Sequence, residues 1–208
     1  MNQEVRMKRM LWGKEIRQLR EKSQVLPDKQ DLIAFYGSSS IRLWETIEED
    51  LHPLNVINLG FGGSSYLWCN YFFEEVFEFV APSKLVLYAG DNDLGNEVPE
   101  EEILESVNGL ISKVDGKYGP IPIAIISVKP SPDRSYLKDK IESLNNRLQA
   151  LIIRRPNGSF IDIYPAMLHS DGSLRPELYI EDELHINEKG YEIWKRVVGE
   201  GLVQRMSD

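Results

Sequence analysis

The segment LIAFYGSSSIRLW, residues 32–44, passes from an apolar run into a glycine, three serines and a helix-compatible pattern. A short apolar run without polar alternation is typical of a parallel strand that is buried on both faces. Glycine permits a tight turn after such a strand, and serine favours the start of a helix. The segment therefore predicts a strand that turns at Gly37 into a helix.

The same order of strand and helix recurs along the chain. Four further apolar runs are found at Asn55–Leu59, Lys84–Ala89, Ile121–Val128 and Ser159–Ile163. Helix-compatible stretches are found at Ser40–Asp50, Trp68–Val80, Glu100–Val114, Ser135–Ile153 and Asn187–Val203. This alternation predicts an α/β fold, a three-layer α/β/α sandwich with a mostly parallel five-stranded sheet and right-handed crossovers.

The N-terminal segment differs from this pattern. Gln3–Lys22 places apolar residues among Lys, Arg and Glu in a loose helical period, which predicts an amphipathic helix. We expect residues 1–30 to form an extension on a single domain, residues 31–208. A docking role for this helix, including a homodimer, is the alternative.

Composition limits the classes of partner. The 208 residues are 42% hydrophobic, which is enough for one core, and 24 basic against 33 acidic side chains give a net charge of −9. An acidic chain argues against a nucleic-acid partner. No run approaches the roughly 20 apolar residues of a membrane span, and no secretory signal is visible. The single Cys69 excludes an internal disulfide framework, so we expect a cytoplasmic protein, although intermolecular pairing stays open.

Polar or glycine-rich segments follow the first three strands. These segments are Gly37–Ser40, Gly60–Gly63 and Gly90–Asp93. Ligands of parallel sheets gather at the carboxyl ends of the strands, so the three segments are expected at one rim. The backbone N–H groups of Gly60–Gly63 and the amide of Asn92 are candidate donors to an oxyanion. A ligand-free glycine turn and an Asx turn are the alternatives.

A serine in this rim needs a base to become a nucleophile. Of the three histidines, His52 and His169 are expected to be structural or at the surface, whereas His185 has Asp182 three residues before it, a spacing that can orient an imidazole. The alternative is an ordinary polar helix entry capped by Asn187. A divalent ion held by Asp91, Asp93, Asp182 and His185 is a further alternative, but it leaves the serines without a role.

The four blocks together resemble the SGNH hydrolase superfamily, also called the GDSL-type esterases and lipases. The blocks are Phe35–Ile41 with Ser39, Asn58–Gly63 with Gly63, Gly90–Asp93 with Asn92, and Asp182–His185. Ser38 stands where the family usually has Asp, which resembles a GSSS-type subset. The order of the blocks holds from about residue 32 to residue 202.

The resemblance implies a flavodoxin-like fold and a serine esterase without a cofactor or metal. Ser39, Asp182 and His185 would form the catalytic triad. The oxyanion hole would consist of the N–H groups of Ser39 and Gly63 and the Asn92 amide. The expected substrate is a small soluble ester, such as an O-acetyl group on a carbohydrate. A thioesterase, a lysophospholipase and a non-catalytic binding module are the alternatives.

Substrate contacts are the least determined part of the site. Ser38, Phe61 and Tyr66 lie near the expected rim in sequence, and aromatic rings can stack on a sugar or line an acyl slot. Core packing is the alternative for the two aromatic residues. The loop that begins at Lys129 and Pro130 resembles a substrate-side loop of the family, or it simply ends a strand.

Overall fold

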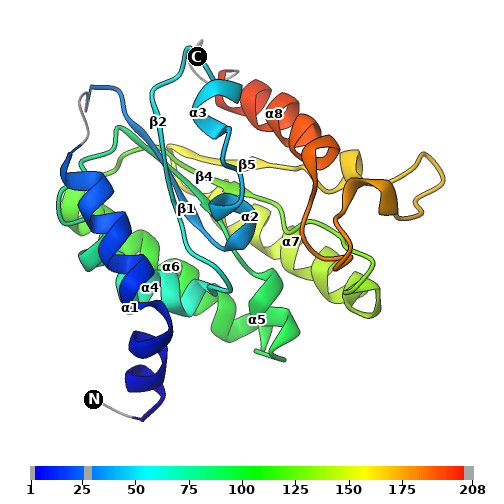
Figure 1. Ribbon diagram of the computed structural model, residues 1–208, viewed down its shortest axis with the longest axis horizontal. Helices are drawn as coiled ribbons and strands as arrows, with labels where there is room; N and C mark the ends of the chain where they lie inside the picture. Colours follow the sequence, from blue (N-terminus) through cyan, green and yellow to red (C-terminus); the bar gives the residue numbers. More distant parts are fainter. Residues whose placement is uncertain (1–2, 26–29, 204–208) are drawn as a thin grey trace.

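Five parallel strands form one sheet at the centre of the protein (Figure 1). The computed structural model describes residues 3–25 and 30–203. The strands are β1 (Ile33–Gly37), β2 (Val56–Gly60), β3 (Lys84–Tyr88), β4 (Ile123–Ile126) and β5 (Gly158–Ile161). Their order is β2-β1-β3-β4-β5, and every neighbouring pair is parallel. All five strands overlap the runs that the sequence predicts.

Helices cover both faces of the sheet (Figure 1). One face carries α1 (Gln3–Gln24), α4 (Tyr66–Val76), α6 (Glu100–Tyr118) and α7 (Lys138–Ile152). The other carries α2 (Ser39–Arg42), α3 (Ile47–Asp50) and α8 (Glu188–Val203). The short helix α5 (Asp91–Gly95) follows β3, and 3₁₀ turns lie at Ser135–Leu137, Pro165–Met167 and Pro176–Leu178. The predicted three-layer α/β/α sandwich is confirmed.

Alternate residues of each strand supply the two cores. Ala34 and Tyr36 of β1 point into the core beneath α1, α4, α6 and α7, whereas Ile33 and Phe35 point into the core beneath α2, α3 and α8. Successive side chains of a strand point to opposite faces, so a strand with helices on both sides is apolar throughout. This double burial explains the unbroken apolar runs in the sequence.

Two local predictions differ from the structure. The helix expected over residues 40–50 is divided into α2 and α3. The Asn58 side-chain amide donates to the carbonyl oxygens of Ile41 at 2.6 Å and Trp44 at 3.2 Å, and so binds the chain where α2 ends. Residues 91–95 form a helix where the sequence predicts only a polar segment.

The carboxyl ends of the first three strands along the chain lie level with one another. Gly37 is in register with Gly60 of β2 and with Tyr88 of β3. A Cβ atom at Gly37 would lie 1.8 Å from the Tyr88 carbonyl oxygen, so only glycine fits there. The chain leaves β1 towards β2 on one side and later returns to β3 on the other. The rim between β1 and β3 is therefore the topological switch point, where ligands of such sheets bind.

Two expectations from composition can be compared with the structure. None of the helices in residues 3–25 and 30–203 is long and apolar enough to cross a bilayer. Cys69 is buried in the aromatic core beneath α4, and burial raises the pKa of its thiol. A buried thiol cannot reach a second chain, so the alternative of pairing through Cys69 is wrong.

Candidate active site

Ser39 is the first residue of α2 and lies directly above the end of β1. The turn that places it there is fixed by the Ser38 N–H, which donates to the Tyr88 carbonyl oxygen at 2.9 Å. The first N–H groups of a helix have no partner within the helix. Within the described residues the Ser39 N–H also has no partner elsewhere. Ser39 thus presents a hydroxyl and a free backbone donor at the switch point.

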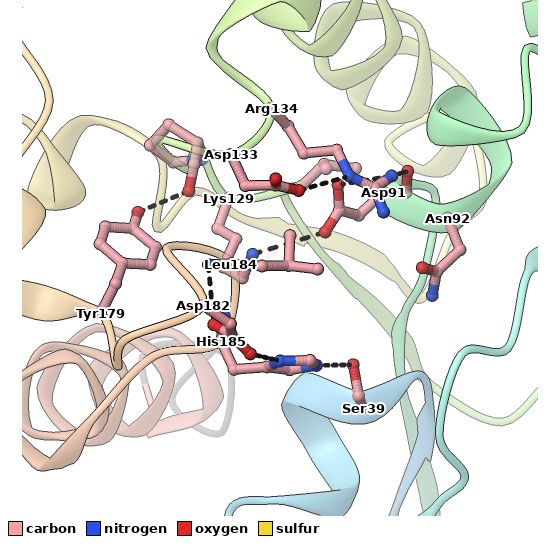
Figure 2. Close-up of polar contacts among 12 residues, drawn as sticks. Ser39, Asp91, Asn92, Lys129, Asp133, Arg134, Tyr179, Asp182, Leu184 and His185 are labelled. Atoms are coloured by element: carbon pink, nitrogen blue, oxygen red, sulfur yellow. Dashed lines mark hydrogen bonds and ion pairs between the residues drawn. The ribbon is translucent and has the colours of Figure 1, made fainter.

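His185 and Asp182 lie beside Ser39, as Figure 2 shows. The Oγ atom of Ser39 is 3.0 Å from Nε2 of His185, and Nδ1 of His185 is 2.6 Å from Oδ2 of Asp182. An ionised carboxylate can only accept, so Nδ1 carries the proton and Nε2 accepts from the Ser39 hydroxyl. The expectation that these three side chains meet is confirmed.

The loop carrying Asp182 and His185 is held in place by its own backbone. Oδ1 of Asp182 accepts from the N–H groups of Leu184 at 2.9 Å and His185 at 2.8 Å. The carbonyl oxygen of His185 accepts from the Ile180 N–H at 2.9 Å. Asn187 then caps α8, since its Oδ1 accepts from Lys189 and Gly190. The predicted cap at Asn187 and the pairing of Asp182 with His185 thus occur together.

Asp182 is an ionised carboxylate at neutral pH. Partial burial acts to raise the pKa of Asp182, but the hydrogen bonds from the His185 side chain and from two backbone N–H groups lower it to about 2. A carboxylate that stays charged stabilises a neighbouring imidazolium. The pair therefore suits proton transfer to and from Ser39.

The two candidate donor loops contact each other near Ser39. Gly63 is exposed, adopts a positive φ of 69°, and has an N–H without a partner among the described residues. Nδ2 of Asn92 donates to the carbonyl oxygen of Ser64 at 3.0 Å, which ties the start of α5 to the residue after Gly63. The structure thus brings the predicted residues Gly63 and Asn92 into adjoining loops.

Asp93 connects α5 to the start of α4. Its carboxylate accepts from the Tyr66 N–H at 3.1 and 3.3 Å and from the Gly90 N–H at 3.1 Å. Burial raises the pKa of this carboxyl to about 7, although these hydrogen bonds act in the opposite direction. Asp93 thereby braces the loop that carries Asn92.

A buried ion network that the sequence analysis missed lies behind Asn92 (Figure 2). The side chain of Lys129 is 1% exposed, and its Nζ atom is 3.4 Å from Oδ2 of Asp91. Arg134 donates to the Asp91 carbonyl oxygen at 2.7 Å and lies 3.6 Å from its Oδ1 atom. The one local signal is that a lysine follows an apolar strand without a break, at the edge where the other site residues gather.

This network also reaches the loop that carries His185. The Asp133 N–H donates to the carbonyl oxygen of Glu183 at 3.1 Å, and the Tyr179 hydroxyl donates to the carbonyl oxygen of Pro130. The ammonium group of Lys129 lies 5.8 Å from the centre of the Tyr179 ring. The segment between Lys129 and Arg134 therefore joins the Asn92 loop to the His185 loop.

The expected substrate contacts of Ser38, Phe61 and Tyr66 are wrong. The three residues are 2%, 0% and 1% exposed, respectively, and leave no surface for a substrate. Phe61 packs in the aromatic core, with ring centres 5.5 Å from Trp12 and 5.9 Å from Tyr36. Ser38 lies beneath the turn into α2, and Tyr66 starts α4 facing inward. Sequence position alone does not show that these three side chains face inward.

The four residues considered as metal ligands have separate partners. Asp91 pairs with Lys129 and Arg134, Asp93 accepts from backbone N–H groups, and Asp182 pairs with His185. In the described ranges, no three His, Cys, Asp or Glu side chains are grouped so that they could hold a metal ion.

Comparison with known proteins agrees with the fold. The platelet-activating factor acetylhydrolase IB subunit alpha1 of Bos taurus is 25% identical over 170 residues, which cover 79% of this chain and 72% of that protein. A protein of Streptococcus pneumonia superposes with a TM-score of 0.81 at 21% identity, covering 96% of this chain and 99% of that one. A variant of an acetylxylan esterase from Geobacillus stearothermophilus superposes with a TM-score of 0.71 at 13% identity, covering 84% and 95%.

The family assignment rests on the greater part of the chain. Residues 32–193 match the model of the GDSL-like lipase/acylhydrolase family, and this range contains all four blocks from Ser39 to His185. The fold is the one found among solved structures of that family, such as the GDSL-like lipase of Bacteroides thetaiotaomicron. The chain therefore belongs to the GDSL-like lipase/acylhydrolase family, within the SGNH hydrolases.

Proposed function

We propose that this protein is a serine esterase that hydrolyses small carboxylic esters through an acyl-enzyme. The observation that carries the proposal is the continuous hydrogen-bonded series from Ser39 through His185 to Asp182, with separations of 3.0 and 2.6 Å. This arrangement is the one in which a base activates a hydroxyl and a carboxylate orients the base.

The proposed reaction has two halves. The Ser39 oxygen attacks the ester carbonyl carbon while Nε2 of His185 takes the hydroxyl proton, and the carbonyl oxygen becomes an oxyanion. The intermediate collapses with cleavage of the bond to the alcohol oxygen, which receives the proton from His185. Water then attacks the acyl-enzyme in the same way and releases the acid and free Ser39. Asp182 stays ionised and stabilises the imidazolium.

Three donors are proposed to bind the oxyanion. The N–H groups of Ser39 and Gly63 are without partners among the described residues, and the Asn92 amide retains a second N–H after donating to Ser64. Donors that are fixed before the reaction stabilise negative charge without reorganisation in the transition state.

The proposed acyl group is acetyl. Two of the similar proteins are an acetylhydrolase and an acetylxylan esterase by name, and they support an acetyl ester of a small soluble alcohol or carbohydrate. The net charge of −9 gives no reason to favour an anionic lipid surface. Longer acyl esters, thioesters and lysophospholipids are the competing substrates.

The test compares Ser39→Ala with Ser40→Ala, a matched loss of a neighbouring hydroxyl. p-Nitrophenyl acetate, butyrate and octanoate measure turnover, and a fluorophosphonate probe followed by mass spectrometry identifies the labelled residue. We expect labelling at Ser39, a loss of about 10⁴-fold or more in kcat for Ser39→Ala, and near wild-type turnover for Ser40→Ala.

The outcomes separate the alternatives. Unlabelled wild-type protein without turnover of any ester or thioester would favour a binding module. Faster hydrolysis of octanoate than of acetate would leave the serine hydrolase in place and reject the acetyl substrate.

A further inference from the structure

Side chains of the N-terminal helix α1 form hydrogen bonds with the backbone of Gly62, the residue that precedes Gly63. The indole Nε1–H of Trp12 donates to the carbonyl oxygen of Gly62 at 2.7 Å, across 50 residues of sequence. The Gly62 N–H donates to Oε1 of Glu15 at 3.2 Å. Both polar backbone atoms of Gly62 are therefore bound by side chains of α1.

The bond from Trp12 fixes more than Gly62. The carbonyl group of Gly62 and the N–H of Gly63 belong to the same planar trans peptide, in which C=O and N–H point in opposite directions. Because Trp12 holds the carbonyl oxygen towards α1, the Gly63 N–H must point away from α1. Two consecutive glycines have no side chains to restrict rotation of this peptide, so an external contact has to do so.

The side chain of Trp12 is itself held in place by its packing. It is 4% exposed, and its ring centre lies 5.5 Å from that of Phe61 and 5.7 Å from that of Trp68. Packed aromatic rings in a protein core have little freedom to change rotamer. The donor on Trp12 is thus held in a constant position relative to the sheet.

Glu15 extends the contact to the helix that begins at Ser39. Its Oε1 atom is 3.5 Å from Nε of Arg42, the last residue of α2. The Arg42 side chain also lies against Gly62, where an added Cβ would come within 3.1 Å of Nε. Glu15 thereby connects α1, the glycine loop and α2.

We propose that Trp12 and Glu15 are positioning residues for the oxyanion donor Gly63. They hold the Gly62–Gly63 peptide so that its N–H faces the reacting carbonyl oxygen. Helix α1 therefore contributes to the active site. The inference rests on the proposed function of Ser39. Trp12 and Glu15 lie outside residues 32–193, the range that matches the family model, so the family blocks alone do not indicate their role.

The first test is Trp12→Phe, which keeps a ring in the core and removes the N–H donor. We expect kcat for p-nitrophenyl acetate to fall about 10- to 100-fold because the oxyanion donor is misaligned. KM should stay within about twofold, and the acid limb of the kcat/KM profile should not move because His185 and Asp182 are untouched.

The matched control is Trp68→Phe, in the same aromatic cluster but without the bond to Gly62. It should lose a similar amount of thermal stability while kcat stays within about twofold of wild type. An equal fall of kcat in both variants, or a change confined to KM in Trp12→Phe, would overturn the role of Trp12.

A second pair of variants tests Glu15 and remains informative if Trp12→Phe does not fold. Glu15→Gln keeps an acceptor for the Gly62 N–H, whereas Glu15→Ala removes it. We expect kcat to fall about 10-fold in Glu15→Ala and to be largely restored in Glu15→Gln. Arg20→Ala controls for loosening α1, because it breaks the ion pair with Glu78 without contacting Gly62.

The possible results are distinct. Equal kcat in Glu15→Ala and wild type would reject the role of Glu15. An equal loss of kcat in Glu15→Ala and Arg20→Ala would show that Glu15 acts only by holding α1 against the rest of the protein. Full activity in Ser39→Ala would instead refute the proposed function, whatever the α1 variants do.

Discussion

Asp182 contacts His185 through both carboxylate oxygens. Oδ2 is 2.6 Å from the ring nitrogen Nδ1, and Oδ1 accepts from the backbone N–H of the same residue at 2.8 Å. The second contact orients the carboxylate, so that the first is made by a group that cannot rotate freely. The ring of His185 is thus held with Nε2 towards Ser39.

Asp182→Asn should therefore reduce kcat by about 10⁴-fold, the effect of the equivalent change in another serine hydrolase. An amide NH₂ facing Nδ1 selects the tautomer with the proton on Nε2, which cannot accept from Ser39. Ester turnover at saturating substrate measures the loss, and circular dichroism checks the fold. A variant that keeps a tenth of wild-type kcat would contradict the assignment of Asp182.

Asn92→Ala should lower kcat about 10²- to 10³-fold with little change in KM, since the amide is proposed to act only when the oxyanion forms. Its bond to Ser64 also orders the loop, so thermal unfolding must be measured alongside steady-state kinetics. Asn96→Ala is a matched control, because Asn96 also lies beside α5 but is exposed. Similar kcat and KM values for the two variants would show that Asn92 is not part of the oxyanion hole.

Asp93 should make the protein less stable as the pH rises towards neutrality. Burial raises the pKa of Asp93 to about 7, whereas an unfolded aspartate has a pKa of about 3.9. Between these values the native state binds more protons than the unfolded state, so the contribution of Asp93 is complete below pH 4 and is lost as the pH rises through 7.

Urea unfolding at pH 5 and pH 7 tests this contribution. Wild type should lose about 2 kcal/mol more of its free energy of unfolding over this interval than Asp93→Asn does, because the asparagine does not titrate. Asn also presents an NH₂ group to the N–H groups of Tyr66 and Gly90, so the variant should be less stable at both pH values. Identical pH slopes for the two proteins would refute the prediction.

Lys129 and Asp91 should be strongly coupled in stability. Lys129→Met leaves a buried carboxylate with only Arg134 nearby, and we expect a loss of about 3 kcal/mol. Lys129→Met combined with Asp91→Asn should cost less than the sum of the two single changes, by about 1–3 kcal/mol.

Urea unfolding of the four proteins gives this coupling energy directly. Arg147→Met, which breaks a half-buried contact with Glu100 and an exposed one with Glu101, is the control and should cost less than about 1 kcal/mol. Additive losses of unfolding free energy for the changes at Lys129 and Asp91 would show that the two side chains do not stabilise each other.

The sheet could be predicted from the sequence because each strand is buried on both faces. The run from Leu32 to Tyr36 is apolar without a break, and the structure places a strand at Ile33–Gly37 with both faces covered. The division between α2 and α3 could not be predicted in the same way. At the end of α2 the carbonyl oxygens of Ile41 and Trp44 accept from the side chain of Asn58 in β2, a contact with a distant part of the sequence.

The residues of the site likewise fall into those that the sequence predicts and those that depend on distant contacts. Ser39, Asp182 and His185 could be predicted to meet because a nucleophile, a base and an acid have a required order of contacts, although their catalytic roles remain predictions. Trp12 and Lys129 contact partners that are distant in sequence, so their contacts could not be predicted from their own segments. The closeness of Phe61 to Gly63 in sequence predicts a place at the rim, but the ring of Phe61 faces the core.

The distance along the chain between Ser39 and His185 has a consequence for biosynthesis. The two residues are 146 positions apart, and the loop of His185 is anchored by Asn187 at the start of α8. A ribosome-bound chain that has folded only its first strands carries a serine without a base. Under the proposed mechanism, hydrolytic capacity would arise only once α8 has docked, and incomplete translation products would be inert towards esters.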